Sequence, residues 1–520
     1  MPQSDPSAEL QHKYPASMTV VPELENLMGE ERVLSAFLAK NPGDDGIPPY
    51  LVDLARIEES RYRLLTAPPA IPSSVPDWTI NPAIELLAVN WSNLPAFMAD
   101  QNVEPTPGAA HVLVLIRPVS GNIEIRDADA DDLLALKIVA EDMDPVSAAA
   151  EGGISVGNIR QLLSRGEQRG LLLSPPSRIR RPPDFSAGEI SNPAYFSAPV
   201  FTLQWHITQA CDLNCRHCYD RSDRETMTVP QALQVLDTLF DFCDRHHVYG
   251  QVSFSGGNPM LYPHFNRIYK EAADRGFMTA IIGNPMPLRR VEEMQSIQAP
   301  EFYQVSLEGM GDHNDYIRGP GHFGRTIDFL EVLGGLGVYR IVMLTLTRDN
   351  MDQVLELAEF LKGRVELFTF NRLASMGEGA KLSSVPPELY PEFLSAYMAA
   401  AKSNASMGFK DNLFNLLRWQ RGDPVGGGCT GFGCGAAFNF ASVLPDGEVH
   451  ACRKMPSWIG SIYEQSLNDI YHGSLARKYR NGSSGCGGCP IRPVCGGCIS
   501  VGFGFGRDIF NEVDPYCFFS

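Results

Sequence analysis

The sequence predicts an α/β fold, a partial (β/α)6 barrel with smaller domains before and after it. Three observations predict this class. Between residues 199 and 375, six β-type apolar runs alternate with helical patterns, which is typical of a parallel sheet. A pattern of two strands and three helices precedes this region, at residues 108–175. A segment rich in glycine and cysteine follows at residues 429–520, and its few apolar runs indicate that metal holds it together.

The chain begins with a region that we expect to be helical. Residues 1–107 show helix-like apolar spacing at 23–38 and 50–65, interrupted by proline-rich breaks at 67–69 and 72–76. No motif there indicates chemistry, so the sequence assigns this region no role.

The next region, residues 108–175, predicts a winged-helix domain. Two β-type runs, at 111–116 and 123–126, flank a Ser-Gly-Asn turn and indicate a strand pair. Three helices follow, the last one between a capping Ser155 and a terminating Gly170. The helices are expected at residues 131–140, after Asp144-Pro145, and at 156–165.

The barrel is expected between a linker and a helical connector. Residues 176–198 are rich in proline, arginine and serine and predict a solvated linker that includes the Arg-Ile-Arg-Arg run at 178–181. Residues 376–428 predict the helical connector. The six barrel strands are expected at 200–207, 251–255, 279–282, 302–306, 341–345 and 366–370.

Length and charge limit the functions that the chain can have. Its 520 residues suffice for about two to four domains. Lys and Arg number 43 against 61 Asp and Glu, and the resulting net charge of −18 repels phosphate backbones. We therefore expect no nucleic-acid partner. The N-terminus lacks the features of a signal peptide, and no apolar run approaches the roughly 20 residues of a membrane helix. A cytoplasmic protein without a membrane partner is expected.

Cysteine is unevenly distributed along the chain. Eleven of the twelve cysteines fall in two groups, and clustered cysteines in a cytosolic protein indicate metal ligands. Cys243 stands alone in a helical pattern and is expected to be a small buried hydrophobe.

The first cysteine group directly follows the first barrel strand. Cys211, Cys215 and Cys218 have the spacing C-x3-C-x2-C, one cysteine short of a closed site. Three thiolates can hold three corners of a [4Fe-4S] cluster, which leaves the fourth iron open to a small molecule. The alternative is a zinc site completed by His206 or His217.

A cysteine triplet of this spacing after the first strand of a six-stranded β/α sheet resembles the radical SAM superfamily. The resemblance implies that the open iron chelates S-adenosylmethionine (SAM). Reduction then yields a 5′-deoxyadenosyl radical, which removes a hydrogen atom from the substrate, while the protein orients and shields the cofactor. The same resemblance makes the three cysteines the catalytic cluster ligands.

Further short motifs resemble those of the superfamily. Gly256-Gly257-Asn258 follows the second strand, where the family has Gly-Gly-Glu, so the usual acid is replaced by an uncharged amide. Ser306 and Glu308 belong to a Ser-Leu-Glu-Gly motif that is similar to the ribose-contacting motif of the family.

The remaining cofactor contacts are also implied by position. Arg318 resembles the arginine that meets the SAM carboxylate, with a surface ion pair as the alternative role. Leu373, after the sixth strand, is expected to pack on the adenine. His217 and Tyr219, within and just after the cysteine triplet, complete the predicted set of cofactor contacts.

The second group holds eight cysteines, enough for two four-cysteine sites. A pair of zinc ribbons is one interpretation. The spacing resembles the SPASM extension of radical SAM enzymes, except that two residues, not three, follow the C-x5-C step. That resemblance implies two auxiliary [4Fe-4S] clusters, three clusters in all. The first would be held by Cys429, Cys434, Cys452 and Cys498, and the second by Cys486, Cys489, Cys495 and Cys517.

The resemblance also bears on the substrate, since SPASM enzymes mostly act on peptides or proteins. Sulfatase-maturing members have a basic Asp where this chain has Arg453, so formylglycine formation is not expected. Residues 108–175 resemble the PqqD-like recognition element of enzymes that modify ribosomally made peptides (RiPPs), in which the leader peptide adds a strand to a small sheet.

Together these features predict an oxidative RiPP maturase that forms a thioether, a crosslink or a heterocycle. Its partners would be a precursor peptide, bound through its leader, and an electron donor such as flavodoxin or ferredoxin. The layout of the chain resembles that of selenobiotic-type maturases. Two alternatives remain: a maturase of a folded protein subunit, and an iron–sulfur electron carrier or regulator that binds DNA. The open triplet with its SAM-type motifs favours an enzyme.

Overall fold

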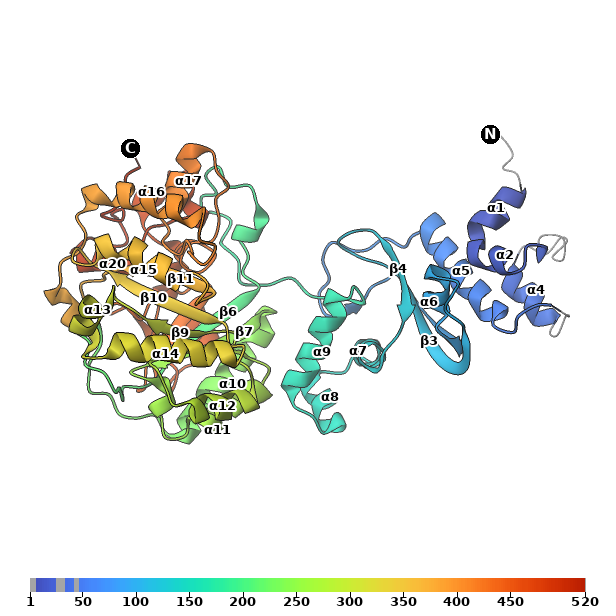
Figure 1. Ribbon diagram of the computed structural model, residues 1–520, viewed down its shortest axis with the longest axis horizontal. Helices are drawn as coiled ribbons and strands as arrows, with labels where there is room; N and C mark the ends of the chain where they lie inside the picture. The colour runs from blue at the N-terminus through green and yellow to red at the C-terminus, as the bar shows by residue number, and fades with distance from the viewer. Residues whose placement is uncertain (1–5, 25–32, 42–45, 520) are drawn as a thin grey trace. The chain divides into compact units, whose positions relative to one another are not determined.

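The computed structural model describes residues 6–24, 33–41 and 46–519. The chain forms two compact units that divide between Pro176 and Ser177 (Figure 1). The described helices and strands of the first unit are α1 (Pro6–Lys13), α2 (Pro15–Val20), α4 (Leu34–Lys40), α5 (Leu51–Thr66), β1 (Thr79–Ile80), β2 (Ile84–Ser92), α6 (Leu94–Ala99), β3 (Thr106–Ile116), β4 (Ile123–Asp127), α7 (Ala130–Ala140), α8 (Pro145–Gly152), α9 (Val156–Gln168) and β5 (Leu172–Leu173).

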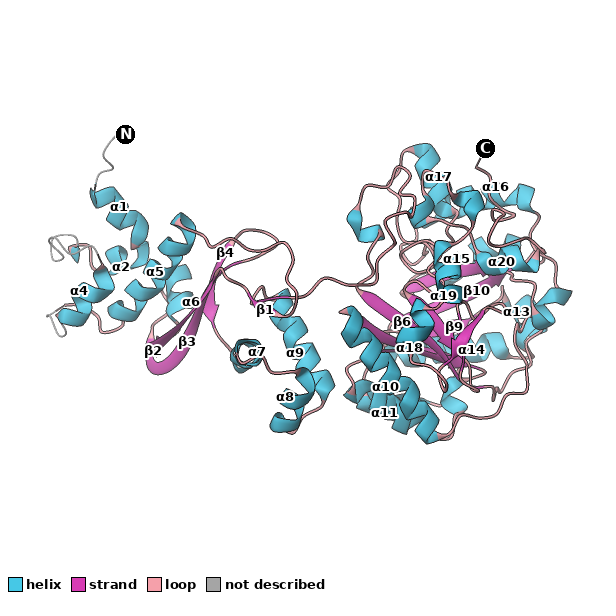
Figure 2. Cartoon of the chain, turned by 180° about the vertical axis from the view of Figure 1, so that it is seen from behind, coloured by secondary structure: helices cyan, strands magenta, loops and turns pink. Residues whose placement is uncertain are grey.

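The first unit is built on an antiparallel sheet in the order β2-β3-β4. Val112 and Val114 of β3 pack against the N-terminal helices, including Leu54 of α5. Leu113 and Leu115 alternate with them and pack against α7 and α9 on the opposite face. The sheet therefore lies between two helical layers (Figure 2).

The elements predicted for the winged-helix domain are confirmed, but the domain begins earlier than expected. The side chains of Asp129, Asp144 and Ser155 cap α7, α8 and α9. The expectation that residues 1–107 are helical is wrong at β1 and β2, although α6 lies beyond them, and a boundary at 108 cuts through β3. The short apolar run of β2 has no clear period and does not distinguish strand from helix. The helix expected at 23–38 falls partly on residues 25–32, outside the described residues.

The second unit begins with a segment that is packed rather than solvated, contrary to the linker prediction. Ile179 is fully buried in the core of this unit. Arg181 stacks over the ring of Phe438 at 4.0 Å and donates to the carbonyl oxygens of Arg480, Phe432 and Cys434. Backbone acceptors bond both terminal nitrogens of the guanidinium and an aromatic ring covers its face, so the arginine-rich composition does not indicate exposure here.

The second unit continues through the predicted barrel and the cysteine-rich segment. Its described elements are β6 (Val200–Thr208), α10 (Val229–His246), β7 (Tyr249–Gly256), α11 (Phe265–Asp274), β8 (Met278–Ile282), α12 (Leu288–Ile297), β9 (Tyr303–Ser306), α13 (Gly311–Arg318), α14 (His322–Gly335), β10 (Arg340–Leu346), α15 (Val354–Leu361), β11 (Leu367–Arg372), α16 (Tyr390–Ala401), α17 (Phe414–Arg421), β12 (Phe440–Val443), β13 (Glu448–His450), β14 (Trp458–Ser461), α18 (Leu467–His472), α19 (Ser474–Asn481) and α20 (Ile499–Gly504), with short 3-10 turns between them.

All six predicted barrel strands are present as β6 to β11, neighbours in chain order and parallel throughout. Because the strands are parallel, their carboxyl ends lie at one edge of the sheet, where α/β proteins bind ligands. β12 from the cysteine-rich segment pairs in parallel with β6 and is followed by antiparallel β13 and β14. The C-terminal segment thus extends the barrel sheet. This pairing fixes the cysteine-rich segment to the barrel at β6.

Two smaller predictions concern burial and membranes. Cys243 is buried in α10, as expected for a small hydrophobe. Among the helices that the structure describes, none is long and apolar enough to cross a membrane.

Candidate active site

The cysteine triplet lies in the loop after β6 and is held directly against the Gly-Gly-Asn turn after β7. The amide of Gly257 donates to the Thr208 carbonyl at 2.9 Å, and the amide of Asn258 donates to the Ala210 carbonyl at 2.8 Å. A Cβ atom on Gly257 would overlap the Ala210 carbonyl oxygen, and Gly256 has φ +124°. The two glycines are therefore needed for the contact between these loops, a role that the sequence did not indicate.

Asn258 is fully buried and belongs to a polar chain that ends at Cys211. Its Nδ2 donates to Asp212 Oδ1 at 3.1 Å. Asn284 donates to the same oxygen at 2.7 Å and lies 3.6 Å from Cys211 Sγ. Asn258 Oδ1 is buried and has no hydrogen-bond partner among the described residues.

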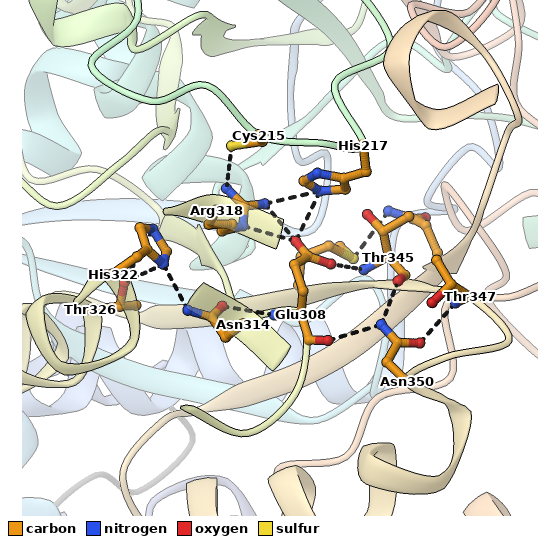
Figure 3. Close-up of polar contacts among 12 residues, drawn as sticks. Cys215, His217, Glu308, Asn314, Arg318, His322, Thr326, Thr345, Thr347 and Asn350 are labelled. Carbon is orange, nitrogen blue, oxygen red and sulfur yellow. Dashed lines mark hydrogen bonds and ion pairs between the residues drawn. The ribbon is translucent and has the colours of Figure 1, made fainter. Parts of the chain in front are cut away.

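Arg318 and Glu308 form the second part of the site (Figure 3). Arg318, the last residue of α13, donates from Nη2 and Nε to Glu308 Oε1, at 2.6 and 3.0 Å. Its Nη1 lies 3.8 Å from Cys215 Sγ, and Nε2 of His217 lies 3.0 Å from Glu308 Oε1. The guanidinium thus lies between a buried carboxylate and the cysteine loop.

Protein groups occupy both carboxylate oxygens of Glu308. The amide of Thr345 donates to Oε2 at 2.7 Å, while Asn314 and Asn350 bond the Glu308 backbone. Burial alone would raise the pKa of Glu308, but His217 and Arg318 outweigh it and lower that pKa. The ribose contact stays a prediction, and the structure adds that Oε1 of this side chain accepts from Arg318.

Tyr219 lies on the side of the triplet that faces the cysteine-rich segment. Its hydroxyl is 3.1 Å from His206 Nε2, and the guanidinium of Arg453 lies 5.8 Å from its ring centre. Burial, reinforced by the charge of Arg453, lowers the pKa of His206 to about 3, so this histidine is neutral at physiological pH. Tyr219 also feels the charges of Cys218 and Cys452, one from each cysteine group.

Two further predicted contacts lie at the same edge of the sheet. Ser306 ends β9, and its side chain is partly exposed. Leu373 directly follows β11 and is buried, with its amide bonded to the Leu346 carbonyl. Apart from Arg318, which ends α13, the predicted SAM contacts therefore come from the carboxyl ends of the barrel strands or the segments that follow them.

The eight C-terminal cysteines separate into two sets by their mutual electrostatic interactions. Cys434 interacts with Cys429, Cys452 and Cys498, and burial raises its thiol pKa to about 12. In the other set, burial raises the pKa of Cys486 to about 11, with added effects of Cys489 and Cys517, and Cys495 interacts with Cys486 and Cys489. The division into two ligand sets that the SPASM resemblance implies stays a prediction.

The donor sets suit clusters in which each thiolate binds its own iron. Within the described residues, no three His, Cys, Asp or Glu side chains are close enough together to hold a single metal ion. Raised thiol pKa values mean that metal binding must displace protons, which is the usual coupling at thiolate sites.

An ion-paired aspartate connects the barrel to the cysteine-rich segment. Arg372 at the end of β11 donates to both oxygens of Asp514 at 2.7 Å, and to Asp411 at 2.8 Å. Asp514 Oδ2 also accepts from the amide of Cys498 at 2.7 Å. One carboxylate therefore fixes the backbone of a cluster cysteine to a barrel strand.

Comparison with known families agrees with this geometry. Residues 205–361 match the radical SAM superfamily model, and residues 434–498 match that of the SPASM iron–sulfur cluster-binding domain. The chain carries a radical SAM domain followed by a SPASM domain. It is accordingly an enzyme of the radical SAM class, and its cofactors are SAM and [4Fe-4S] clusters.

Several named proteins are similar to this chain. An AdoMet-dependent heme synthase of Methanosarcina barkeri is 26% identical over 61% of this chain and 96% of its own length. The subtilosin biosynthesis protein AlbA of Bacillus subtilis is 24% identical over 57% of this chain and 67% of its own. The mycofactocin maturase MftC of Mycolicibacterium smegmatis is 28% identical over 62% and 83%. SuiB of Streptococcus suis, solved with precursor peptide SuiA, has a TM-score of 0.50 at 17% identity, covering 79% of this chain and 97% of SuiB, which shows the fold alone.

The sequence missed the polar residues that support the SAM-binding loops. Asn284 comes two residues after β8, and Asn350 lies in the turn after β10, each near the carboxyl end of a strand. Asp212 follows the first cysteine directly. Their place at the carboxyl ends of strands could have indicated a role in ligand binding. Their hydrogen-bond partners could not be predicted, because these lie on loops distant in sequence.

Proposed function

We propose that this enzyme oxidises a ribosomally made precursor peptide. One observation carries the proposal: Arg453, which directly follows Cys452, lies 5.8 Å from the ring centre of Tyr219, which directly follows Cys218, so the two cysteine groups approach each other here. An auxiliary cluster beside the radical site suits removal of a second electron from the substrate. The net reaction is then a loss of two hydrogens, as in formation of a thioether, a crosslink or a heterocycle.

At the radical site, Cys211, Cys215 and Cys218 would hold a [4Fe-4S] cluster that works together with SAM. When bound and reduced, this pair supplies a 5′-deoxyadenosyl radical that takes a hydrogen atom from the substrate. Arg318, fixed by Glu308, offers Nη1 beside Cys215 to the SAM carboxylate. Asn258 Oδ1, buried without a partner among the described residues, is an acceptor for the SAM amino group.

The remaining predicted contacts have supporting roles. Gly256 and Gly257 keep the cysteine loop in register, and Ser306 and Leu373 line the ribose and adenine side. His217 and Tyr219 flank Cys218 and hold the cysteine loop through their contacts with Glu308 and His206. An external donor such as flavodoxin or ferredoxin supplies the electron.

The two cysteine sets each hold an auxiliary [4Fe-4S] cluster. The ligands of the first are Cys429, Cys434, Cys452 and Cys498, and those of the second are Cys486, Cys489, Cys495 and Cys517. Arg372 and Asp514 keep the first set at the barrel edge through the amide of Cys498.

The first unit is the part that grips the leader, as a PqqD-like element. One sheet edge, β2, is already covered, because Asp53 accepts from the Asn90 amide at 2.7 Å and Arg56 donates to the Ala88 carbonyl at 2.8 Å. At the other edge, the register of β3 and β4 turns the amides and carbonyls of Ile123 and Ile125 away from β3. These groups have no hydrogen-bond partner within the described residues, so an extended peptide can add a strand to β4.

The likeness to AlbA and MftC supports a peptide substrate, and the layout supports a selenobiotic-type maturase. A haem-type substrate is the second candidate, favoured by the match to 96% of an AdoMet-dependent heme synthase. The curated relatives match only about 57–62% of this chain. The chain also has a first unit of 176 residues, and a role for this unit in leader binding favours the peptide over the haem-type substrate.

The radical chemistry is tested by SAM cleavage. The reconstituted, reduced enzyme is expected to form 5′-deoxyadenosine, and Cys215→Ala should abolish it, whereas Cys243→Ala should not. Persistent cleavage in Cys215→Ala would contradict the assignment of the triplet.

The substrate is tested by the mass of a short peptide encoded beside the gene, after anaerobic incubation with enzyme, SAM and reductant. Loss of two hydrogens per modified site is expected, and fragmentation locates the bond. An unchanged peptide beside vigorous 5′-deoxyadenosine formation would leave the radical chemistry intact and remove that peptide as substrate.

Leader binding to β4 is tested with Ile125→Pro, which removes an outward amide donor without removing a ladder bond. Binding of the fluorescently labelled precursor should weaken, by about tenfold if one or two strand hydrogen bonds are lost. Ile125→Val keeps the donor and serves as the control. Equal binding by both variants would place the leader elsewhere.

A further inference from the structure

Three cationic side chains gather beside the first auxiliary cysteine set. Lys410 comes from the connector before α17, and Arg453 and Lys454 follow β13. Each is partly buried. Arg453 and Lys454 directly follow Cys452 of this set. Burial lowers the pKa of Lys410, and the nearby charges of Lys454 and Arg453 lower it further.

These cations lack acidic partners. Within the part of the chain that the structure describes, none of the three forms an ion pair with an aspartate or glutamate, although the chain holds 61 acidic residues against 43 basic ones. Asp411, next to Lys410 in sequence, is taken up by Arg372 at 2.8 Å. The buried arginines of the barrel edge, Arg318 and Arg372, both have carboxylate partners. Partly buried cations without partners are costly, which suggests that something outside the chain completes them.

Arg453 differs from the two lysines in what it faces. Lys454 interacts most with Cys498 and Cys429, so cluster thiolates offset the lysine charges. Arg453 instead lies 5.8 Å over the Tyr219 ring and acts on His206 and Tyr219, on the side of the radical site. Because Arg453 directly follows Cys452 and Tyr219 directly follows Cys218, its guanidinium lies between the two cysteine groups.

We propose that Arg453, with the charge of Lys410 adding to its own, binds a carboxylate of the substrate between the radical site and the first auxiliary cluster. The carboxylate belongs to an acidic side chain or to the C-terminus of the peptide. This inference rests on the proposed peptide substrate. A guanidinium fork matches a carboxylate with two parallel hydrogen bonds, which fixes the position of the residue that carries it. Arg453 is thus a specificity-determining residue, and the modified position lies next to the bound carboxylate.

The test is chemical footprinting of Arg453 in the full-length enzyme with its clusters assembled, under anaerobic conditions. Phenylglyoxal labels accessible guanidinium groups, and mass spectrometry measures the labelling rate of each arginine. Three synthetic probes are compared: acetyl-Gly-Gly-Asp-Gly-Gly-amide, its Asn counterpart, and acetyl-pentaglycine with a free C-terminus. Arg289, whose side chain is 87% exposed, is the internal control.

The Asp probe, the free-acid probe or both should slow labelling of Arg453 by about fivefold or more at saturation, while the Asn probe has no effect. Protection by the Asp probe alone assigns a side-chain carboxylate, and protection by the free acid alone assigns the C-terminus. Lys410→Gln should weaken the protection. Labelling of Arg289 should be the same throughout.

Two results would overturn the inference. Equal labelling of Arg453 with all probes would mean that the cations only offset cluster charge. Equal protection by the Asn probe would mean that the peptide backbone, and not a carboxylate, occupies the place. Neither result depends on SAM cleavage, which continues to test the radical chemistry separately.

Discussion

The guanidinium of Arg318 is fixed by the buried carboxylate of Glu308, 2.6 Å from Nη2 to Oε1, with Nη1 left facing Cys215 at 3.8 Å. Glu308 is itself held from behind by the Thr345 amide (Figure 3). The direction of the arginine is therefore set by the protein before any cofactor arrives. An oriented charge of this kind binds a carboxylate at little cost in side-chain entropy.

Glu308→Gln should release this orientation. Removing one partner of a buried ion pair costs about 3–5 kcal/mol, because the other charge is left uncompensated. We expect a lower free energy of unfolding and at least about tenfold weaker SAM binding, measured by equilibrium dialysis on reconstituted enzyme. Glu331→Gln removes an exposed partner of Arg364 and should change neither quantity. Unchanged SAM affinity in Glu308→Gln would show that Arg318 does not need this carboxylate.

Gly257→Ala should disturb the cysteine triplet without touching a ligand. A Cβ at this position would overlap the Ala210 carbonyl oxygen, so one of the two loops must move. We expect lower iron content at the radical site and slower 5′-deoxyadenosine formation. Gly324→Ala is the matched control, since its Cβ meets nothing within 4 Å, and alanine favours the helix. If both variants retain full iron and activity, the loop contact does not position the cluster.

The sequence was most informative where a pattern is short and local. The strands β6 to β11 are buried apolar runs at regular intervals, and the cysteine spacing is what makes the C-terminal segment resemble the SPASM extension. The sequence was least informative where the hydrogen-bond partners of a residue are distant in the chain. Arg181 is partly buried and packed in place by carbonyls more than 250 positions away that accept its hydrogen bonds, and no local pattern indicates that. Glu308 resembles a ribose-binding acid in its motif, yet its partners, Arg318 and Thr345, are fixed by tertiary structure.

Asp514→Asn should loosen the SPASM domain selectively. Asp514 joins Arg372 of β11 to the amide of Cys498, and loss of its charge leaves the buried arginine with Asp411 alone. We expect the variant to lose iron from the auxiliary clusters while the SAM-dependent cluster remains. Iron analysis and EPR of the reduced enzyme measure both. Asp508→Asn, an exposed residue of the same segment, should leave all clusters in place. Full auxiliary iron in Asp514→Asn would argue that the link is not required.

The first unit should lose stability as the pH rises, because of Glu58 in α5. Burial raises the pKa of this carboxyl group to about 7, despite hydrogen bonds from Ser17 and Ala16. The folded state thus prefers the protonated acid. Its contribution is fully present below the ordinary pKa of 4.5 and is lost as the pH rises through about 7. The loss amounts to about 3 kcal/mol by pH 8.

Limited proteolysis in a urea series, with fragments of α5 identified by mass spectrometry, measures this effect. The midpoint for the native chain should be lower at pH 8 than at pH 5.5. Glu58→Gln stays neutral and should remove most of that difference, whereas Glu151→Gln, an exposed residue of α8, should preserve it. A midpoint that does not change with pH in the native chain would mean that the Ser17 and Ala16 hydrogen bonds hold Glu58 in its charged form, because their stabilisation of the carboxylate would then outweigh its burial.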